Sequence, residues 1–110
     1  MNLLKETLEF LKENNLEPKD VLWVGNSEIK TDWDNFAKIA NINYNSGYGG
    51  QKVAYDLLIV GKDWWLERHE YDGSEWWEFK QLPKEPGSNV KLRCVVGDYP
   101  WSDLKEIKAY

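Results

Sequence analysis

The chain has 110 residues, of which 42% are hydrophobic and 15% aromatic, and its formal net charge is −5 from 19 acidic and 14 basic residues. This composition is too apolar for an intrinsically disordered chain, and the length suits one core, so we expect a single domain over residues 1–110. The acidic balance argues against binding of duplex nucleic acid, because such proteins need a basic surface to contact phosphates.

The apolar runs are short and cysteine is rare. Four residues, 57–60, form one of the longest apolar runs, far below the roughly 18 residues that span a bilayer. The first ten residues contain acids and no apolar core segment, which predicts no secretory signal. Cys94 is the only cysteine, so no internal disulfide can form, and its apolar run predicts a buried thiol. We therefore expect a cytoplasmic protein with no membrane partner.

The first half of the chain predicts two helices around a short strand. Residues 2–14 carry leucines at helical spacing and form an amphipathic helix. Residues 20–25 are a short strand that ends at a glycine, and residues 28–30 can pair back on it. Thr31 is placed to cap a second helix. The apolar face of that helix contains Trp33, Phe36, Ala37 and Ala40.

The second half predicts a β-meander. Residues 41–51 form a glycine-rich loop that lacks the Lys-Ser/Thr pattern of a phosphate-binding loop. Strands then follow up to residue 80, with a first two-residue turn at Gly61-Lys62. Residues 90–96 alternate apolar and polar side chains and predict a further strand, and a short helix with Trp101, Leu104 and Ile107 on one side ends the chain. The predicted class is α+β, with a mostly antiparallel sheet and the helices largely on one face.

Residues 64–79, WWLERHEYDGSEWWEF, contain two tryptophan doublets on either side of a turn. Adjacent residues of a strand point to opposite faces, so each doublet must place one indole on each face. A two-residue turn at Asp72-Gly73 would set Glu67 opposite Glu78 and also Glu70 opposite Glu75, and facing like charges are unfavourable. We therefore predict a three-residue loop over residues 71–73.

In this register, one face of the hairpin is the core face and the other is mixed. The mixed face presents three aromatic anchors, Trp65, Trp77 and Phe79. Three polar residues accompany them: Glu67, His69 and Glu75. Such a patch is typical of a binding surface, and it predicts a protein partner or self-association as a homodimer. The alternative is that residues 82–96 or the last helix cover this face within the chain.

The sequence contains no motif for a metal, a cofactor or catalysis. One histidine and one cysteine, 25 residues apart, do not make a zinc site. His69 near Glu67 resembles a general acid–base group, but a nuclease also needs cations for the phosphate, and only Arg68 is close by. We predict a non-enzymatic protein-binding module. A homodimeric structural domain, a carbohydrate-binding platform and a His69-dependent nuclease or hydrolase remain alternatives.

Three stretches together suggest a biological setting: DVLWVG, the helix WDNFAKIA and the run DLLIVGKDWWLERHEYDGSEWWEFK. They resemble small uncharacterised proteins encoded by phages and prophages of Gram-positive bacteria. The resemblance covers roughly residues 20 to 80 and rests mainly on the aromatic hairpin. It implies a protein made in the bacterial cytoplasm that acts on host or phage proteins, and it transfers no catalytic residue.

Overall fold

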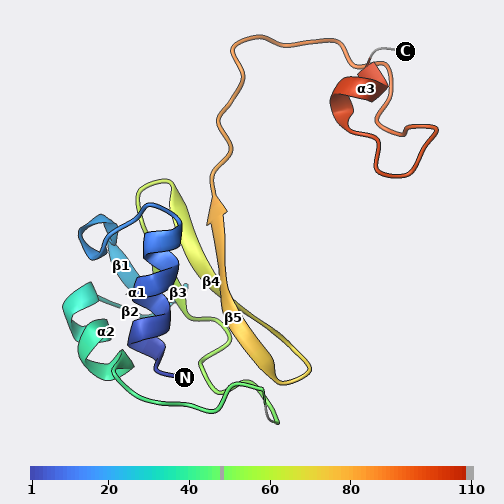
Figure 1. Cartoon of the computed structure of the whole chain (residues 1–110). Helices are drawn as coiled ribbons and strands as arrows, with labels where there is room; N and C mark the ends of the chain where they lie inside the picture. The colour runs from blue at the N-terminus through green and yellow to red at the C-terminus, as the bar shows by residue number, and fades with distance from the viewer. Residues whose placement is uncertain (48, 109–110) are drawn as a thin grey trace.

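The structure is a computed structural model that describes residues 1–47 and 49–108. Over these residues it contains three α-helices, one short 3₁₀ helix and a five-stranded sheet in which all neighbouring strands are antiparallel. The predicted α+β class is therefore confirmed (Figure 1). The elements are α1 (Leu3–Glu13), η1 (Pro18–Asp20), β1 (Trp23–Gly25), β2 (Lys30–Thr31), α2 (Trp33–Ala40), β3 (Leu58–Val60), β4 (Trp64–Tyr71), β5 (Ser74–Gln81) and α3 (Leu104–Lys108).

Helices α1 and α2 form where the apolar spacing predicts them. Asn2 caps α1, because its side-chain oxygen accepts the N–H of Lys5 at 3.0 Å. The cap of α2 is Asp32, whose side chain accepts the N–H of Asn35 at 2.8 Å. The prediction of Thr31 as this cap is wrong, since Thr31 is the last residue of β2. The shift of one residue leaves the buried face of α2 unchanged.

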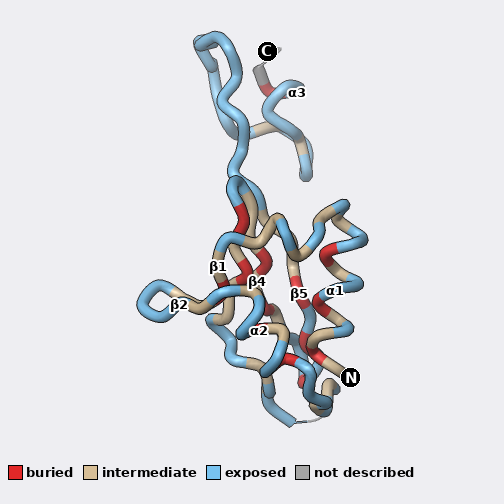
Figure 2. The backbone as a smooth tube through the Cα atoms, turned by 90° about the vertical axis from the view of Figure 1, so that its left-hand side faces the viewer, coloured by how far each residue is buried: buried red, intermediate tan, exposed pale blue. Residues whose placement is uncertain are grey.

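Both long helices pack on the same face of the sheet. The strand order is β2-β1-β3-β4-β5, so β5 is one edge and β2 is the other. Figure 2 shows the buried positions between α1 and the strands. We call this side the core face and the opposite side the outer face. The core cluster contains Leu3, Leu11, Val24, Phe36, Ala40, Ile59, Leu66 and Trp77.

The β4–β5 hairpin has a different register from the one predicted. Tyr71 lies opposite Ser74, which leaves a two-residue turn at Asp72-Gly73. These two residues have φ angles of 51° and 85°, as a type I′ turn requires. Because side chains alternate, this change of one residue exchanges the two faces of β5. The residues that change sides are Glu75, Trp76, Trp77, Glu78 and Phe79.

The β3–β4 turn also differs from the prediction, but with a smaller consequence. The turn residues are Lys62 and Asp63, and the N–H of Gly61 donates to the carbonyl of Trp64 at 2.9 Å. The predicted register is off by two residues, so every side chain of β4 keeps its predicted face. A Cβ on Gly61 would lie 2.1 Å from the Trp64 indole, so this close approach requires glycine.

Residues 82–108, which we call the C-terminal arm, extend away from the rest of the chain (Figure 1). The radius of gyration is 18.5 Å, whereas a compact domain of this size has about 13 Å. The predicted strand over residues 90–96 is wrong, because the chain there is irregular and exposed. Cys94 is exposed rather than buried. The single domain over residues 1–110 stays a prediction.

Candidate functional site

Two of the predicted binding residues, Trp77 and Glu75, are buried on the core face. Trp77 is 2% exposed, and its Nε1–H donates to Thr7 Oγ1 at 2.9 Å, which joins β5 to α1. Glu75 Oε1 accepts a 2.7 Å hydrogen bond from Nη2 of Arg68, and neither side chain is exposed. The Arg68 guanidinium lies 4.7 Å from the Trp77 ring centroid. These residues are therefore not available to a partner.

Arg68 and Glu75 belong to a buried polar cluster that joins four segments of the chain. Arg68 also donates to Glu6 Oε2 at 3.0 Å and to the Tyr44 hydroxyl at 3.2 Å. The Glu75 carboxylate accepts the backbone N–H groups of residues 52–53 at 2.7 and 3.2 Å. The cluster connects α1, the loop between α2 and β3, β4 and β5. Its hydrogen bonds therefore hold these four segments together in the interior of the chain.

The contacts in this cluster determine its charge states. Burial acts to raise the pKa of Glu75, but hydrogen bonds from the Lys52 backbone and from Arg68 outweigh it and lower that pKa. Burial and the hydrogen bond to Glu6 raise the pKa of Tyr44 to about 12. At neutral pH, Glu75 is therefore a carboxylate and Tyr44 is a neutral phenol that donates to Glu6.

The outer face presents a flat row of aromatic and polar side chains that the described helices leave uncovered. Trp23, Val60, Trp65 and Lys80 lie opposite one another across four neighbouring strands. Trp76 faces His69 nearer the hairpin turn and is 37% exposed. None of these residues is buried. The outer-face patch consists of Trp23, Leu58, Val60, Trp65, Glu67, His69, Trp76, Glu78 and Lys80.

The polar groups of this patch form a continuous chain of contacts from Trp65 to Trp76. Trp65 Nε1–H donates to Glu67 Oε1 at 2.7 Å, and His69 Nε2 lies 2.6 Å from Glu67 Oε2. His69 Nδ1 lies 3.5 Å from Glu78 Oε2, and Trp76 Nε1–H donates to that same oxygen at 3.1 Å. Two indoles and two carboxylates are thus arranged around one imidazole. The arrangement limits rotation of both indoles before any partner binds.

The two carboxylates of the patch carry negative charge at neutral pH. The hydrogen bond from Trp65, followed by that from His69, lowers the pKa of Glu67. The hydrogen bond from Trp76 lowers the pKa of Glu78. Lys80 Nζ lies 3.4 Å from Glu78 Oε1 and offsets part of this charge. The centre of the patch is therefore acidic and flanked by aromatic rings.

The structure brings together three of the six predicted binding residues and separates the other three from them. Trp65, Glu67 and His69 lie on the outer face as predicted. Trp77 and Glu75 lie on the core face, and so does Phe79, which stacks on Trp64 with ring centroids 6.3 Å apart. Sequence reasoning missed the three patch members on β5: Trp76, Glu78 and Lys80. The Asp-Gly turn signal would have identified them, because it selects the observed register.

The imidazole of His69 is enclosed by carboxylates of the chain itself. Each ring nitrogen faces one of these carboxylates, one from Glu67 and one from Glu78. A histidine that acts as a general base needs one ring nitrogen directed at the substrate, and these carboxylates occupy both directions. Across residues 1–47 and 49–108, no three His, Cys, Asp or Glu side chains are placed to hold a metal ion. The patch contains a single cationic side chain, Lys80, whereas phosphoryl chemistry needs several positive groups.

No family model, curated protein or solved structure matches this chain. None of the described helices has the length and apolar character needed to cross a bilayer. A function for the chain must therefore be inferred from the geometry of the outer face alone.

Proposed function

We propose that the chain is a non-enzymatic protein-binding module whose outer-face patch docks a partner that presents basic side chains. The observation that carries this proposal is the pair of indoles, Trp65 and Trp76, each held by a hydrogen bond to a neighbouring glutamate. Interfaces favour aromatic anchors surrounded by polar groups. A carboxylate beside an indole suits a guanidinium or ammonium group, which can form an ion pair and a cation–π contact together.

Two further considerations support a binding role over a catalytic one. The imidazole of His69 is engaged on both sides by Glu67 and Glu78, so it serves to order the patch. The net charge of −5 also favours association with a basic partner. The setting we propose is a bacterial cytoplasm, where a phage or prophage accessory protein would act on a host or phage protein.

A peptide array tests this proposal through the chemistry that the partner must present. The full chain is applied to short peptides of graded charge and aromatic content, and bound peptides are then titrated in solution. We expect the basic peptides to bind best. The double variant Trp65→Ser/Trp76→Ser should lose about 2 kcal/mol of binding free energy or more, as is usual for anchor residues.

The matched control is Trp101→Ser, because Trp101 is 90% exposed and lies in the arm, away from the outer face. This variant should bind basic peptides as the unmodified chain does. Equal binding by the double variant would contradict the proposal, and so would a preference for acidic peptides. A saturable tryptophan fluorescence response to glycans in place of peptides would favour the carbohydrate-binding alternative.

A further inference from the structure

The long edge of the sheet, strand β5, has no partner strand among the described residues. It spans Ser74–Gln81 and pairs with β4 on one side only. Because the Tyr71–Ser74 pair closes a two-residue turn, ladder bonds alternate from there, and residues 75, 77, 79 and 81 point their N–H and C=O groups away from β4. An eight-residue edge of this kind is a template for another strand.

The C-terminal arm contains a segment whose composition suits this edge. Residues 90–96, VKLRCVV, alternate apolar residues with cations and are rich in β-branched side chains. Several apolar side chains of the arm are exposed in the structure, including Val90, Leu92, Val95 and Val96. The chain bends at residues 93 and 95, so pairing would require this segment to straighten. A strand partner would cover these side chains and satisfy the edge at the same time.

We propose that residues 90–96 of one copy of this chain pair antiparallel with β5 of a second copy, so that two copies exchange their arms. The register that we infer sets Lys91 opposite Glu78 and Arg93 opposite Trp76. An ion pair and a cation–π contact then form on the outer face. In the same register Leu92 lies beside Trp77 on the core face. If residues 90–96 were shifted by two residues along β5, Lys91 would lie opposite Lys80. Repulsion between these two like charges disfavours that register.

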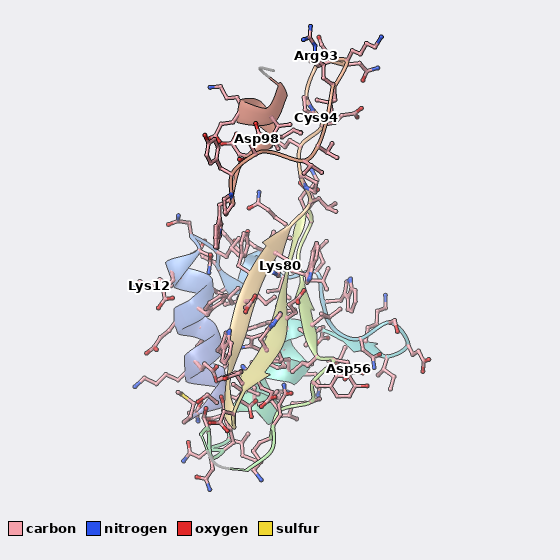
Figure 3. The ribbon with its side chains drawn as sticks, turned by 90° about the vertical axis from the view of Figure 1, so that its right-hand side faces the viewer. Lys12, Asp56, Lys80, Arg93, Cys94 and Asp98 are labelled. Atoms are coloured by element: carbon pink, nitrogen blue, oxygen red, sulfur yellow. The ribbon has the colours of Figure 1, made fainter. Side chains whose placement is uncertain are left out.

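The course of the arm argues for a second copy over a return to the same β5. In the inferred register, an intramolecular hairpin would have its midpoint at Lys84-Glu85, between Pro83 and Pro86. Proline fixes its own φ and biases the residue before it toward extended conformations, so this linker resists reversal. Figure 3 shows Arg93 and Cys94 at the far end of the molecule from the sheet. The exchange goes beyond the proposed function, because it adds strand pairing along the edge of β5. It shares Trp76 and Glu78 with the outer-face patch.

Disulfide trapping between two different single-cysteine proteins tests the exchange. In a Cys94→Ala background, one protein carries Glu78→Cys and the other carries Lys91→Cys. The two positions would face each other as a pair without ladder hydrogen bonds, where Cβ atoms are close enough for a disulfide. After mixing and mild oxidation, we expect a covalent heterodimer of twice the 13.0 kDa chain mass. The matched control replaces Glu78→Cys by Glu28→Cys, an exposed position in the β1–β2 turn at the other side of the sheet.

Three results would overturn the proposal. The first combines two observations: the mixture forms no heterodimer, and a single chain that carries both Glu78→Cys and Lys91→Cys forms an internal disulfide. This result would show that the segment pairs with β5 of its own chain. The second is the absence of a disulfide in either arrangement. The third is equal cross-linking with Glu28→Cys, which would show random collision.

Sedimentation of the full chain without added cysteines provides an independent measurement. We expect the measured mass to approach twice the monomer mass as the concentration rises. In the double variant Lys91→Glu/Arg93→Glu, the dissociation constant of the dimer should be roughly tenfold larger. Trp65→Ser should leave this dissociation constant nearly unchanged, because Trp65 lies on β4 opposite Lys80 and faces neither Lys91 nor Arg93 in the inferred register. Peptide binding can therefore fail while the exchange persists, and the exchange can fail while peptide binding persists. A monomer at all concentrations would contradict the exchange.

Discussion

Nη2 of Arg68 lies 2.7 Å from Oε1 of Glu75, and both side chains are completely buried between the sheet and α1. The charges of such a pair are costly to remove from water, and their attraction repays this cost only when the other polar atoms are satisfied. Glu75 meets this condition through the backbone N–H groups of residues 52–53. Arg68 meets it only in part, because Glu6 and Tyr44 accept from its Nη atoms while its buried Nε has no hydrogen-bond partner among the described residues. Removal of Glu75 would leave Arg68 with only the partly exposed carboxylate of Glu6 as an anionic partner.

We expect Glu75→Gln to lower the free energy of unfolding by about 3 kcal/mol or more, because it leaves a buried guanidinium without its closest anion. Urea denaturation followed by tryptophan fluorescence measures the change. Glu70→Gln is the matched control, since Glu70 lies directly across the hairpin from Glu75 but is exposed. Similar losses in the two variants would show that the buried ion pair has no special role in stability.

Acid should weaken the fold through the same carboxylate. The pKa of Glu75 is lower in the folded chain than its ordinary value of 4.5, so its contribution to stability is complete above that ordinary value. The contribution is lost as the pH falls through the lowered pKa of the folded state. Denaturation between about pH 3 and 7 should show a steep decline at the acidic end that Glu75→Gln reduces. A decline of the same steepness in the variant would contradict this assignment.

The second tryptophan doublet offers a direct test of the hairpin register. We expect Trp77→Ser to cost about 3–5 kcal/mol of stability, because it empties a buried site and removes the hydrogen bond to Thr7. Trp76→Ser should cost less than about 1 kcal/mol, because Trp76 lies on the outer face. Thermal or urea denaturation of the two variants separates these values. The reverse order of effects would support the three-residue loop.

The two long helices could be predicted from the sequence because their local signals agree with their packing. The leucine spacing of α1 and the face containing Phe36 and Ala40 in α2 each identify a side that must be covered. The side of the sheet that the helices cover follows from the same logic, since Val24, Ile59 and Leu66 lie opposite one another on neighbouring strands. Local periodicity therefore determined most of the fold.

The binding surface could be predicted only in part, because an expected charge repulsion was given too much weight. The observed register does place Glu67 opposite Glu78. His69 lies between their carboxylates, and Trp65 and Trp76 donate to one each, so hydrogen bonds act against the repulsion. The turn preference of Asp72-Gly73 decides the register instead, since few dipeptides accept two left-handed conformations.

The strand predicted over residues 90–96 illustrates a different limit of sequence reasoning. Alternation of apolar and polar residues shows which side of a strand would be buried, but it does not supply a neighbouring strand. A single chain in isolation leaves these residues irregular. The pattern and the structure agree if the missing neighbour is β5 of another chain, as in the proposed exchange of arms.

The single carboxylate of Glu75 holds backbone amides from a loop, a guanidinium from β4 and, through Arg68, a carboxylate from α1. Segments tied at one point open together, so their amide protons should exchange with deuterium at similar slow rates. The two-residue strand β2 and the C-terminal arm lie outside this cluster and should exchange much earlier. We therefore expect two rates of amide exchange in this chain. The segments joined by the buried polar cluster around Glu75 should exchange slowly, and β2 and the C-terminal arm should exchange fast.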